Sequence, residues 1–133
     1  MGKKEQVNSS LVAFKYVNDV FKGLDHEELW ILYLNNNIEP VSLERVTSGG
    51  WTSTIIDLRQ IFSLALNHHS TGMIMFHNHL SGNPIPSESD ITNTRKISKV
   101  GKILDIRLID HIIISDNGYY SFSALWHGCS SYQ

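Results

Sequence analysis

Two histidines and one aspartate have the spacing of a metal site. His77 and His79 lie two residues apart at the end of an apolar run, and ten residues separate His79 from Asp90. Because side chains of a strand alternate, both imidazoles leave one face about 7 Å apart, within reach of a single ion. Two neutral nitrogens and a carboxylate oxygen are a ligand set typical of zinc, and three protein ligands leave a fourth position for water. Such a site activates water for attack on a carbonyl group.

The same residues also fit the start of a helix without any metal. Ser87 and Asp90 have the spacing of a capping box, in which the serine caps the helix and the aspartate reaches back. A bare His-x-His pattern recurs by chance, and a histidine at a strand end is often a surface residue. The two interpretations are compatible, because a capped helix start is a rigid mount for a ligand. The full combination is more specific than any of its parts.

The pattern of apolar residues predicts the elements that position this cluster. A period of 3.6 predicts helices over residues 9–23, 55–67 and 90–101, with Ser9 or Ser10 as the first cap. Apolar runs and alternation predict strands at residues 29–34, 40–46, 71–77, 108–115 and 119–122. Turn-forming residues lie at 35–37, 48–50, 81–86 and 116–118. With no repeats and no low-complexity linker, the sequence predicts one α/β domain with a mixed sheet.

Composition excludes several classes of protein. A chain of 133 residues that is 41% hydrophobic and 18% charged is ordinary for one globular domain. The single cysteine, Cys129, excludes a disulfide scaffold, a cysteine-based zinc finger and the paired cysteines of a cytidine deaminase. The net charge is −2 and no basic stripe is visible, which argues against independent binding of nucleic acid. The basic residues at helical spacing are interpreted as a solvated helix face: Arg95, Lys96, Lys99 and Lys102.

No segment has the character of a membrane span. The sequence has no run of about 18 apolar residues, and no apolar region follows the charged N-terminal residues. We therefore expect a cytoplasmic protein with no membrane partner.

The motif residues resemble a known family. His77-x-His79 with Ser87 and Asp90 is similar to the JAMM (MPN-plus) metalloprotease motif. The surrounding segments, His-Asn-His-x-Ser-Gly-Asn-Pro from His77 and Leu-Ile-Asp-His ending at His111, resemble the RadC family specifically. The resemblance covers residues 25–122 and implies the JAMM/MPN fold, a mixed sheet with flanking helices related to the cytidine-deaminase fold. We expect a helical segment at 1–24, the RadC-like domain at 25–125 and a tail at 126–133.

The resemblance also implies roles for these residues. It makes His77, His79 and Asp90 the ligands of a catalytic Zn²⁺, and Ser87 a hydrogen-bonding partner of the oxyanion or the water. The family requires a glutamate upstream of the histidines, and Glu27 and Glu28 are adjacent candidates. Glu27 is favoured because the family pattern puts this residue eight positions before a strand-ending Asn or Asp, here Asn35. Strand alternation allows only one of the two to face the metal. Glu44 is a third choice, interpreted as a solvated residue.

The implied function is a zinc-dependent hydrolase of amide bonds, with a peptide or isopeptide as substrate. The alternative is a non-catalytic interaction module associated with DNA repair, as the family's traditional name suggests. RadC proteins often carry an N-terminal helix-hairpin-helix module, which no segment here resembles, so we expect a short form or an excised domain. Exposed edge strands would allow two copies of the chain to form a homodimer.

Other residues have two interpretations or depart from the family pattern. Family members typically have proline after the second histidine, whereas this chain has Leu80, so the loop loses a fixed φ while the ligands are retained. Asp110 and His111 could support the zinc ligands as a carboxylate–imidazole pair, or satisfy each other at a strand end. His68 and His69 fit the C-terminus of a helix.

Overall fold

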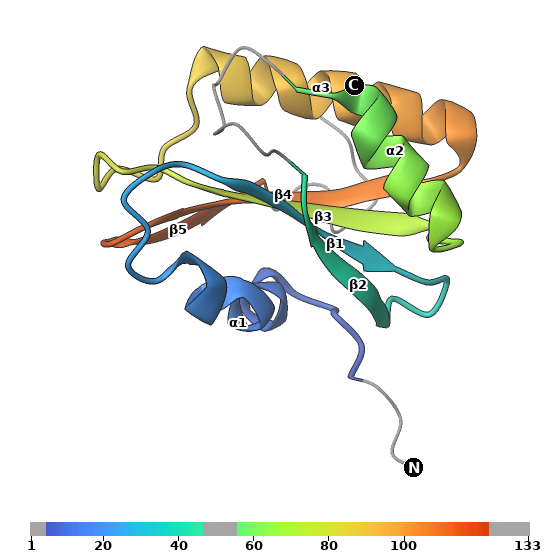
Figure 1. Cartoon of the computed structure of the whole chain (residues 1–133), viewed down its shortest axis with the longest axis horizontal. Helices are drawn as coiled ribbons and strands as arrows, with labels where there is room; N and C mark the ends of the chain where they lie inside the picture. The colour runs from blue at the N-terminus through green and yellow to red at the C-terminus, as the bar shows by residue number, and fades with distance from the viewer. Residues whose placement is uncertain (1–4, 47–55, 123–133) are drawn as a thin grey trace.

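The computed structural model describes residues 5–46 and 56–122. Within them the chain forms a five-stranded sheet with strand order β2-β1-β3-β4-β5, flanked by helices (Figure 1). The strands are β1 (Leu29–Leu34), β2 (Pro40–Arg45), β3 (Gly72–Asn78), β4 (Arg107–Ser115) and β5 (Gly118–Ser121). The helices are α1 (Ser10–Phe21), α2 (Leu58–Asn67) and α3 (Glu88–Leu104). This is the predicted α/β class with a mixed sheet.

The sheet combines antiparallel and parallel pairing. β1 runs antiparallel to both β2 and β3, β3 runs parallel to β4, and β4 runs antiparallel to β5. The crossover between the parallel strands β3 and β4 is α3. The carboxyl ends of β3 and β4 therefore meet at the edge of the sheet where α3 begins.

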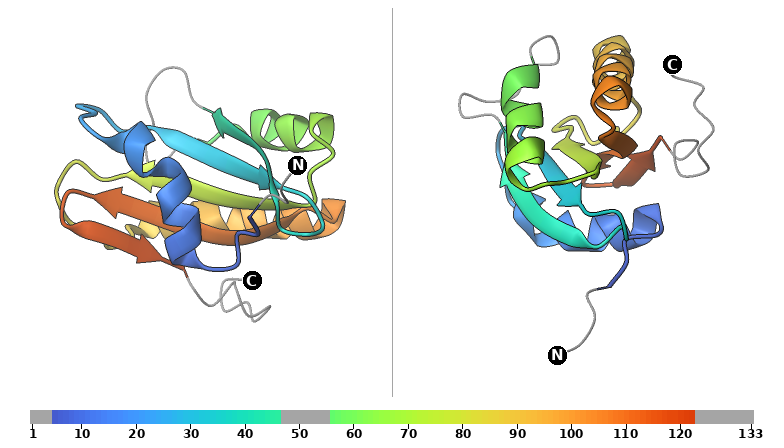
Figure 2. Two further views of the ribbon diagram at one scale, coloured as in Figure 1. Left: turned by 90° about the horizontal axis from the view of Figure 1, so that it is seen from below. Right: turned by 90° about the vertical axis from the view of Figure 1, so that its right-hand side faces the viewer.

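Helices cover both faces of the sheet, α1 on one and α2 with α3 on the other (Figure 2). Alternate side chains of β1 enter different cores: Ile31 packs with the α2 and α3 residues, and Leu32 packs with those of α1. His77 is paired with Leu29, which belongs to the α2/α3 core. Since paired residues of neighbouring strands project to the same face, His77 points toward α3.

One irregularity interrupts the pairing of β3 with β4. Met73 pairs with Leu108, but the next residue, Ile74, pairs with Asp110. Ile109 is therefore an extra residue, a β-bulge that puts Ile109 and Asp110 on the α1 side together. From there His111 pairs with Met75 and points to the α2/α3 side.

The predicted elements are all present, with shifted ends. α2 begins at Leu58, not at residue 55, because the Asp57 carboxylate accepts the N–H groups of Arg59 and Gln60. Leu66 fits the periodic apolar face of α2 but is 57% exposed.

α3 is longer than its predicted range, residues 90–101. Ser87 caps it and Asp105, in the left-handed region, ends it. Gly101 lies inside the helix and does not end it. The position requires glycine because a Cβ there would meet the Ile106 carbonyl oxygen at 2.2 Å. The basic residues of α3 are exposed, as predicted: Arg95, Lys96, Lys99 and Lys102.

Some predictions fall on residues that the structure does not describe. These are the turn at 48–50, Cys129 and the tail at 126–133. None of α1, α2 and α3 is long and apolar enough to cross a membrane. α1 packs on the same sheet as the other elements, through Ala13, Val17 and Phe21, and the domain boundary at residue 25 stays a prediction.

Candidate metal centre

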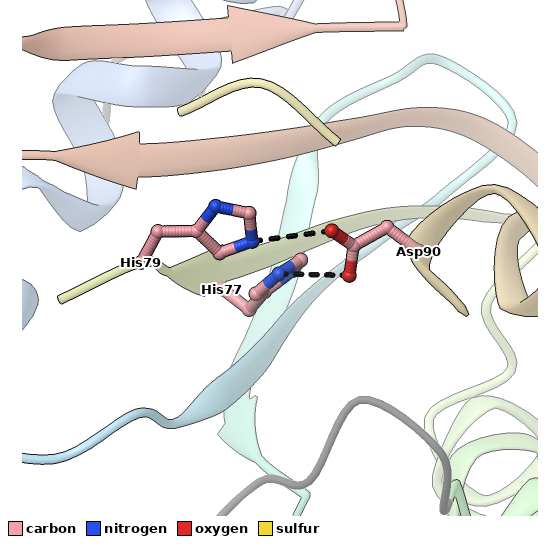
Figure 3. A group of neighbouring side chains, drawn as sticks. All are labelled: His77, His79 and Asp90. Carbon is pink, nitrogen blue, oxygen red and sulfur yellow. Dashed lines mark hydrogen bonds and ion pairs between the residues drawn. The ribbon is translucent and has the colours of Figure 1, made fainter. Parts of the chain in front are cut away.

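His77, His79 and Asp90 converge at the junction of β3 and α3 (Figure 3). His77 is the penultimate residue of β3, His79 follows the strand, and Asp90 lies in the first turn of α3. The two carboxylate oxygens of Asp90 face one histidine each: Oδ1 lies 3.1 Å from Nε2 of His77, and Oδ2 lies 3.1 Å from Nε2 of His79. One ligand atom from each residue lies within 4.8 Å of the others. The three side chains can therefore reach a common ion.

The start of α3 holds Asp90 in place. The Ser87 N–H donates to Oδ2 of Asp90 at 2.8 Å, and the Asp90 N–H donates to Oγ of Ser87 at 3.1 Å. This is the predicted capping box. Because the Ser87 oxygen accepts in this contact, its own hydroxyl proton is left for donation. The positive end of the helix dipole also favours the carboxylate here.

His79 is oriented by the loop that follows it. Its Nδ1 lies 2.9 Å from the carbonyl oxygen of Asn83. A carbonyl only accepts hydrogen bonds, so Nδ1 carries the proton and the neutral ring has its lone pair on Nε2, facing Asp90. Single-sequence reasoning did not find this contact, because it depends on the path of the loop.

His77 is oriented by a residue that the sequence left ambiguous. Its Nδ1 lies 2.7 Å from Nε2 of His111, and Nδ1 of His111 lies 2.6 Å from Oγ1 of Thr94. Asp110 accepts the backbone N–H of His111 and the hydroxyl of Ser121. Of the expected carboxylate–imidazole support, the imidazole is present: both residues lie inside β4, and His111 contacts the candidate ligand His77.

The cluster shifts the pKa values of its members. Burial alone would raise the pKa of Asp90, but the imidazoles of His77 and His79 and the Ser87 N–H hold that pKa well below its ordinary range. Asp90 raises the pKa of His79 against the effect of burial, and Glu27 adds to the increase. Complete burial, assisted by His77, lowers the pKa of His111 well below its ordinary value. Asp90 is therefore an anion next to imidazole rings.

This arrangement fits a divalent cation. Within residues 5–46 and 56–122, no group donates a hydrogen bond to the buried Oδ1 of Asp90. When Nδ1 of His79 donates to the Asn83 carbonyl and Nδ1 of His77 donates to His111, each neutral ring has its lone pair on Nε2. Both lone pairs then face the negatively charged carboxylate of Asp90, so acceptors face acceptors. Such a contact is favourable only when a cation, either protons or a metal, lies among these atoms. The donor set of two imidazoles and a carboxylate suits zinc.

The two glutamate candidates have different surroundings. The carboxylate of Glu27 accepts the Leu80 N–H at 3.3 Å, directly after the candidate ligand His79. Glu28 is buried, and its carboxylate accepts the indole N–H of Trp30 at 2.9 Å. Trp30 packs with the α1 core, on the opposite face from His77. Of the two, Glu27 lies beside the ligand cluster.

Glu44 lies on β2, outside the cluster. Its carboxylate accepts the Ser42 hydroxyl at 2.5 Å and lies 2.9 Å from Nε2 of His68. Neither of these two contacts involves His77, His79 or Asp90.

A pocket of about 410 Å³ adjoins His79. Its walls come from the last turn of α1 and the residues after it, and from the carboxyl ends of β3 and β4 with the residues that follow them; they include Lys22, Leu24, Leu80 and Asp116. Ligands of α/β proteins often bind at the carboxyl ends of parallel strands. The pocket borders the cluster through His79 alone, because His77, Asp90, Ser87 and Glu27 are not among its lining residues.

Comparison with known proteins agrees with this geometry. The model of the RadC-like JAB domain matches residues 7–128. A UPF0758 protein of Flavobacterium johnsoniae is 42% identical over 120 residues, which is 90% of this chain and 52% of the relative. A UPF0758 protein of Porphyromonas gingivalis is 37% identical over 124 residues, 92% of this chain and 55% of the relative. The chain thus spans about half the length of these curated relatives. It belongs to the family of RadC-like JAB domains.

Proposed function

We propose that this domain is a zinc-dependent hydrolase of amide bonds. The observation that carries the proposal is the convergence of Nε2 of His77, Nε2 of His79 and the Asp90 carboxylate, each oriented by a contact behind it. Three protein ligands are typical of catalytic zinc sites, since structural sites use four.

When bound, a divalent cation supplies Lewis acidity for a carbonyl oxygen and acidifies water. His77, His79 and Asp90 would hold it. The protons that the cluster binds in its absence must leave on binding, so affinity falls with decreasing pH.

Glu27 is the proposed general base. Its position next to His79 puts a carboxylate at the rim of the cluster, where Oε2 accepts the Leu80 N–H. Glu27 takes a proton from water as the new C–O bond forms, and it gives that proton to the leaving nitrogen as the C–N bond breaks. The products are a carboxylic acid and an amine, and the acid then ionises by losing its proton to the amine or to solvent.

Ser87 is the proposed oxyanion donor. Its oxygen accepts the Asp90 N–H, so its proton points away from the helix end. Donation of this proton to the developing oxyanion would stabilise the transition state. The proposed substrate is a peptide or an isopeptide, part of which the pocket beside His79 would receive.

Metal analysis and paired glutamate variants test the proposal. We expect about one zinc per chain, lost in His79→Ala. Glu27→Gln should keep zinc and abolish hydrolysis of fluorogenic peptide and isopeptide libraries. Glu28→Gln is the matched control, with zinc and turnover retained in the folded fraction.

A chain that binds no zinc would end the hydrolase proposal, and full activity in Glu27→Gln would require another base. Zinc binding without turnover of any amide would favour the interaction module. A salt-dependent titration with DNA would then test for nucleic-acid binding.

A further inference from the structure

A continuous chain of hydrogen-bonding groups connects two of the proposed ligands behind the site. Nδ1 of His77 lies 2.7 Å from Nε2 of His111, whose Nδ1 lies 2.6 Å from Oγ1 of Thr94. The Thr94 hydroxyl lies 2.7 Å from the backbone carbonyl oxygen of Asp90. The chain therefore begins at one ligand residue and ends at another.

The direction of each hydrogen bond in this chain follows from the group at its end, the Asp90 backbone carbonyl. The Asp90 carbonyl can only accept, so the single proton of the Thr94 hydroxyl is donated to it. The Thr94 oxygen must then accept from Nδ1–H of His111. A neutral His111 has its lone pair on Nε2, which accepts from Nδ1–H of His77. The lone pair of a neutral His77 is thereby on Nε2, the atom that faces Asp90.

The surroundings of His111 hold its ring in a single place. His111 has no exposed surface, and burying a charged ring without a counter-ion is unfavourable. Its ring stacks on Phe122 with a centroid distance of 5.0 Å and an interplanar angle of 5°. The Phe122 N–H also donates to the His111 carbonyl at 3.1 Å. Packing and hydrogen bonds together restrict the ring to the orientation that meets His77.

We propose that His111 and Thr94 are positioning residues, which keep His77 protonated on Nδ1 so that Nε2 is presented as a metal ligand. This inference rests on the proposed zinc site. It adds that ligand geometry depends on two residues that do not touch the metal. Partners behind metal-binding histidines typically contribute about 10- to 100-fold to metal affinity.

Nuclear magnetic resonance of ¹⁵N-histidine-labelled full-length protein tests the hydrogen bond directly. We expect a protected Nδ1–H on His77 with coupling to Nε2 of His111, both without metal and with Zn²⁺. On addition of Zn²⁺, Nε2 and not Nδ1 of His77 should move to the range of a ligated nitrogen, as should Nε2 of His79. A proton on Nε2 and ligation through Nδ1 would overturn the proposal.

Zinc affinity in matched variants gives a second readout. His111→Leu and Thr94→Val should weaken Zn²⁺ binding, measured by competition with a chelator, by about 10- to 100-fold. His111→Gln and Thr94→Ser, which keep an acceptor and a hydroxyl, should recover most of that loss. Phe122→Leu disturbs the packing of the ring without removing a hydrogen bond, and it should have a smaller effect than His111→Leu.

The outcomes separate this inference from the proposed function. Absence of zinc binding by the parent chain removes the zinc site, and the two proposals fall together. Equal zinc affinity in the parent, His111→Leu and Thr94→Val would leave the zinc site intact and refute the positioning role. If His111→Leu does not fold, the parent spectrum and the Thr94 pair still decide the question.

Discussion

The carboxylate of Asp90 accepts the Ser87 N–H at 2.8 Å through Oδ2, the same oxygen that lies 3.1 Å from Nε2 of His79. Helix capping and ligand placement are therefore properties of one side chain. A change that disturbs the cap shifts the ligand, and a bound cation stabilises the start of α3.

Removal of the Ser87 hydroxyl should separate stability from metal binding. Ser87→Ala deletes the acceptor of the Asp90 N–H, which costs about 1 kcal/mol of unfolding free energy in urea titrations. Zinc should be retained, because the backbone N–H of Ser87 still holds the carboxylate. Turnover should fall by roughly 100-fold through loss of the oxyanion donor. Ser87→Thr is the control that keeps cap and hydroxyl, and loss of zinc in Ser87→Ala would contradict the expectation.

Zinc should stabilise the folded chain through the cluster. At a free Zn²⁺ concentration a thousandfold above the dissociation constant, binding adds about 4 kcal/mol to the free energy of unfolding. Calorimetry with and without a chelator measures the corresponding increase in Tm. The increase should vanish in His79→Ala and persist in His68→Ala, whose side chain contacts Glu44 instead. An equal increase in both variants would place the zinc elsewhere.

Leu80 supplies a hydrogen bond that proline cannot. Its N–H donates to Oε2 of Glu27 at 3.3 Å, in competition with water for the proposed base. Leu80→Pro removes this donor, which leaves the Glu27 carboxylate free to accept from water. We expect turnover to rise about two- to tenfold, which corresponds to the free energy of one ordinary hydrogen bond. Leu80→Ala, which keeps the N–H, should match the parent. Slower turnover with zinc retained would show instead that the N–H positions Glu27.

His26 should titrate above its ordinary range. Hydrogen bonds to Asp25 and then Glu28 raise the pKa of His26, and its ring nitrogens lie 2.8 and 2.7 Å from these carboxylates. Since the folded-state value is raised, its stabilising contribution is full below the ordinary value of about 6.5. That contribution is lost as the pH rises through the raised value. The shift is measured by NMR titration, and Glu28→Gln should lower the midpoint.

Gly101 should not tolerate alanine, although alanine usually stabilises a helix interior by about 1 kcal/mol relative to glycine. A Cβ would lie 2.2 Å from the Ile106 carbonyl oxygen. The Ile106 N–H donates to the Gly101 carbonyl at 2.8 Å, so that backbone cannot move away easily. We expect a net loss of about 1–3 kcal/mol in urea unfolding. Ile103→Ala, at a side chain 76% exposed, is the near-neutral control.

Local patterns predicted the parts of the fold that depend on nearby residues. The run at β1 is apolar because both faces of the strand are covered, and Ser87 with Asp90 are spaced for a cap that closes within one turn. These signals lie within a few residues of each other, so a single sequence contains them.

The support behind His77 could not be predicted in this way. His77 and His111 are 34 positions apart, and their contact depends on which strands are neighbours and in what register. Alternation from Leu108 would have put Asp110, not His111, on the face of α3. The end of α3 was also missed, since the role of Gly101 depends on the return path through Ile106.

The β-bulge at Ile109 in β4 determines which charged groups lie beside the cluster. Ile109 sends Asp110 to the α1 side, where Ser121 donates to it, and turns an uncharged ring toward His77. With regular alternation a second carboxylate would adjoin the cluster and neutralise any divalent cation held there. With Asp90 as its one carboxylate ligand, such a cation would keep a net positive charge, which withdraws electrons from a carbonyl group, while the Glu27 carboxylate lies at the rim and accepts the Leu80 N–H. The extra residue Ile109 in β4 thus keeps a second carboxylate ligand out of the cluster.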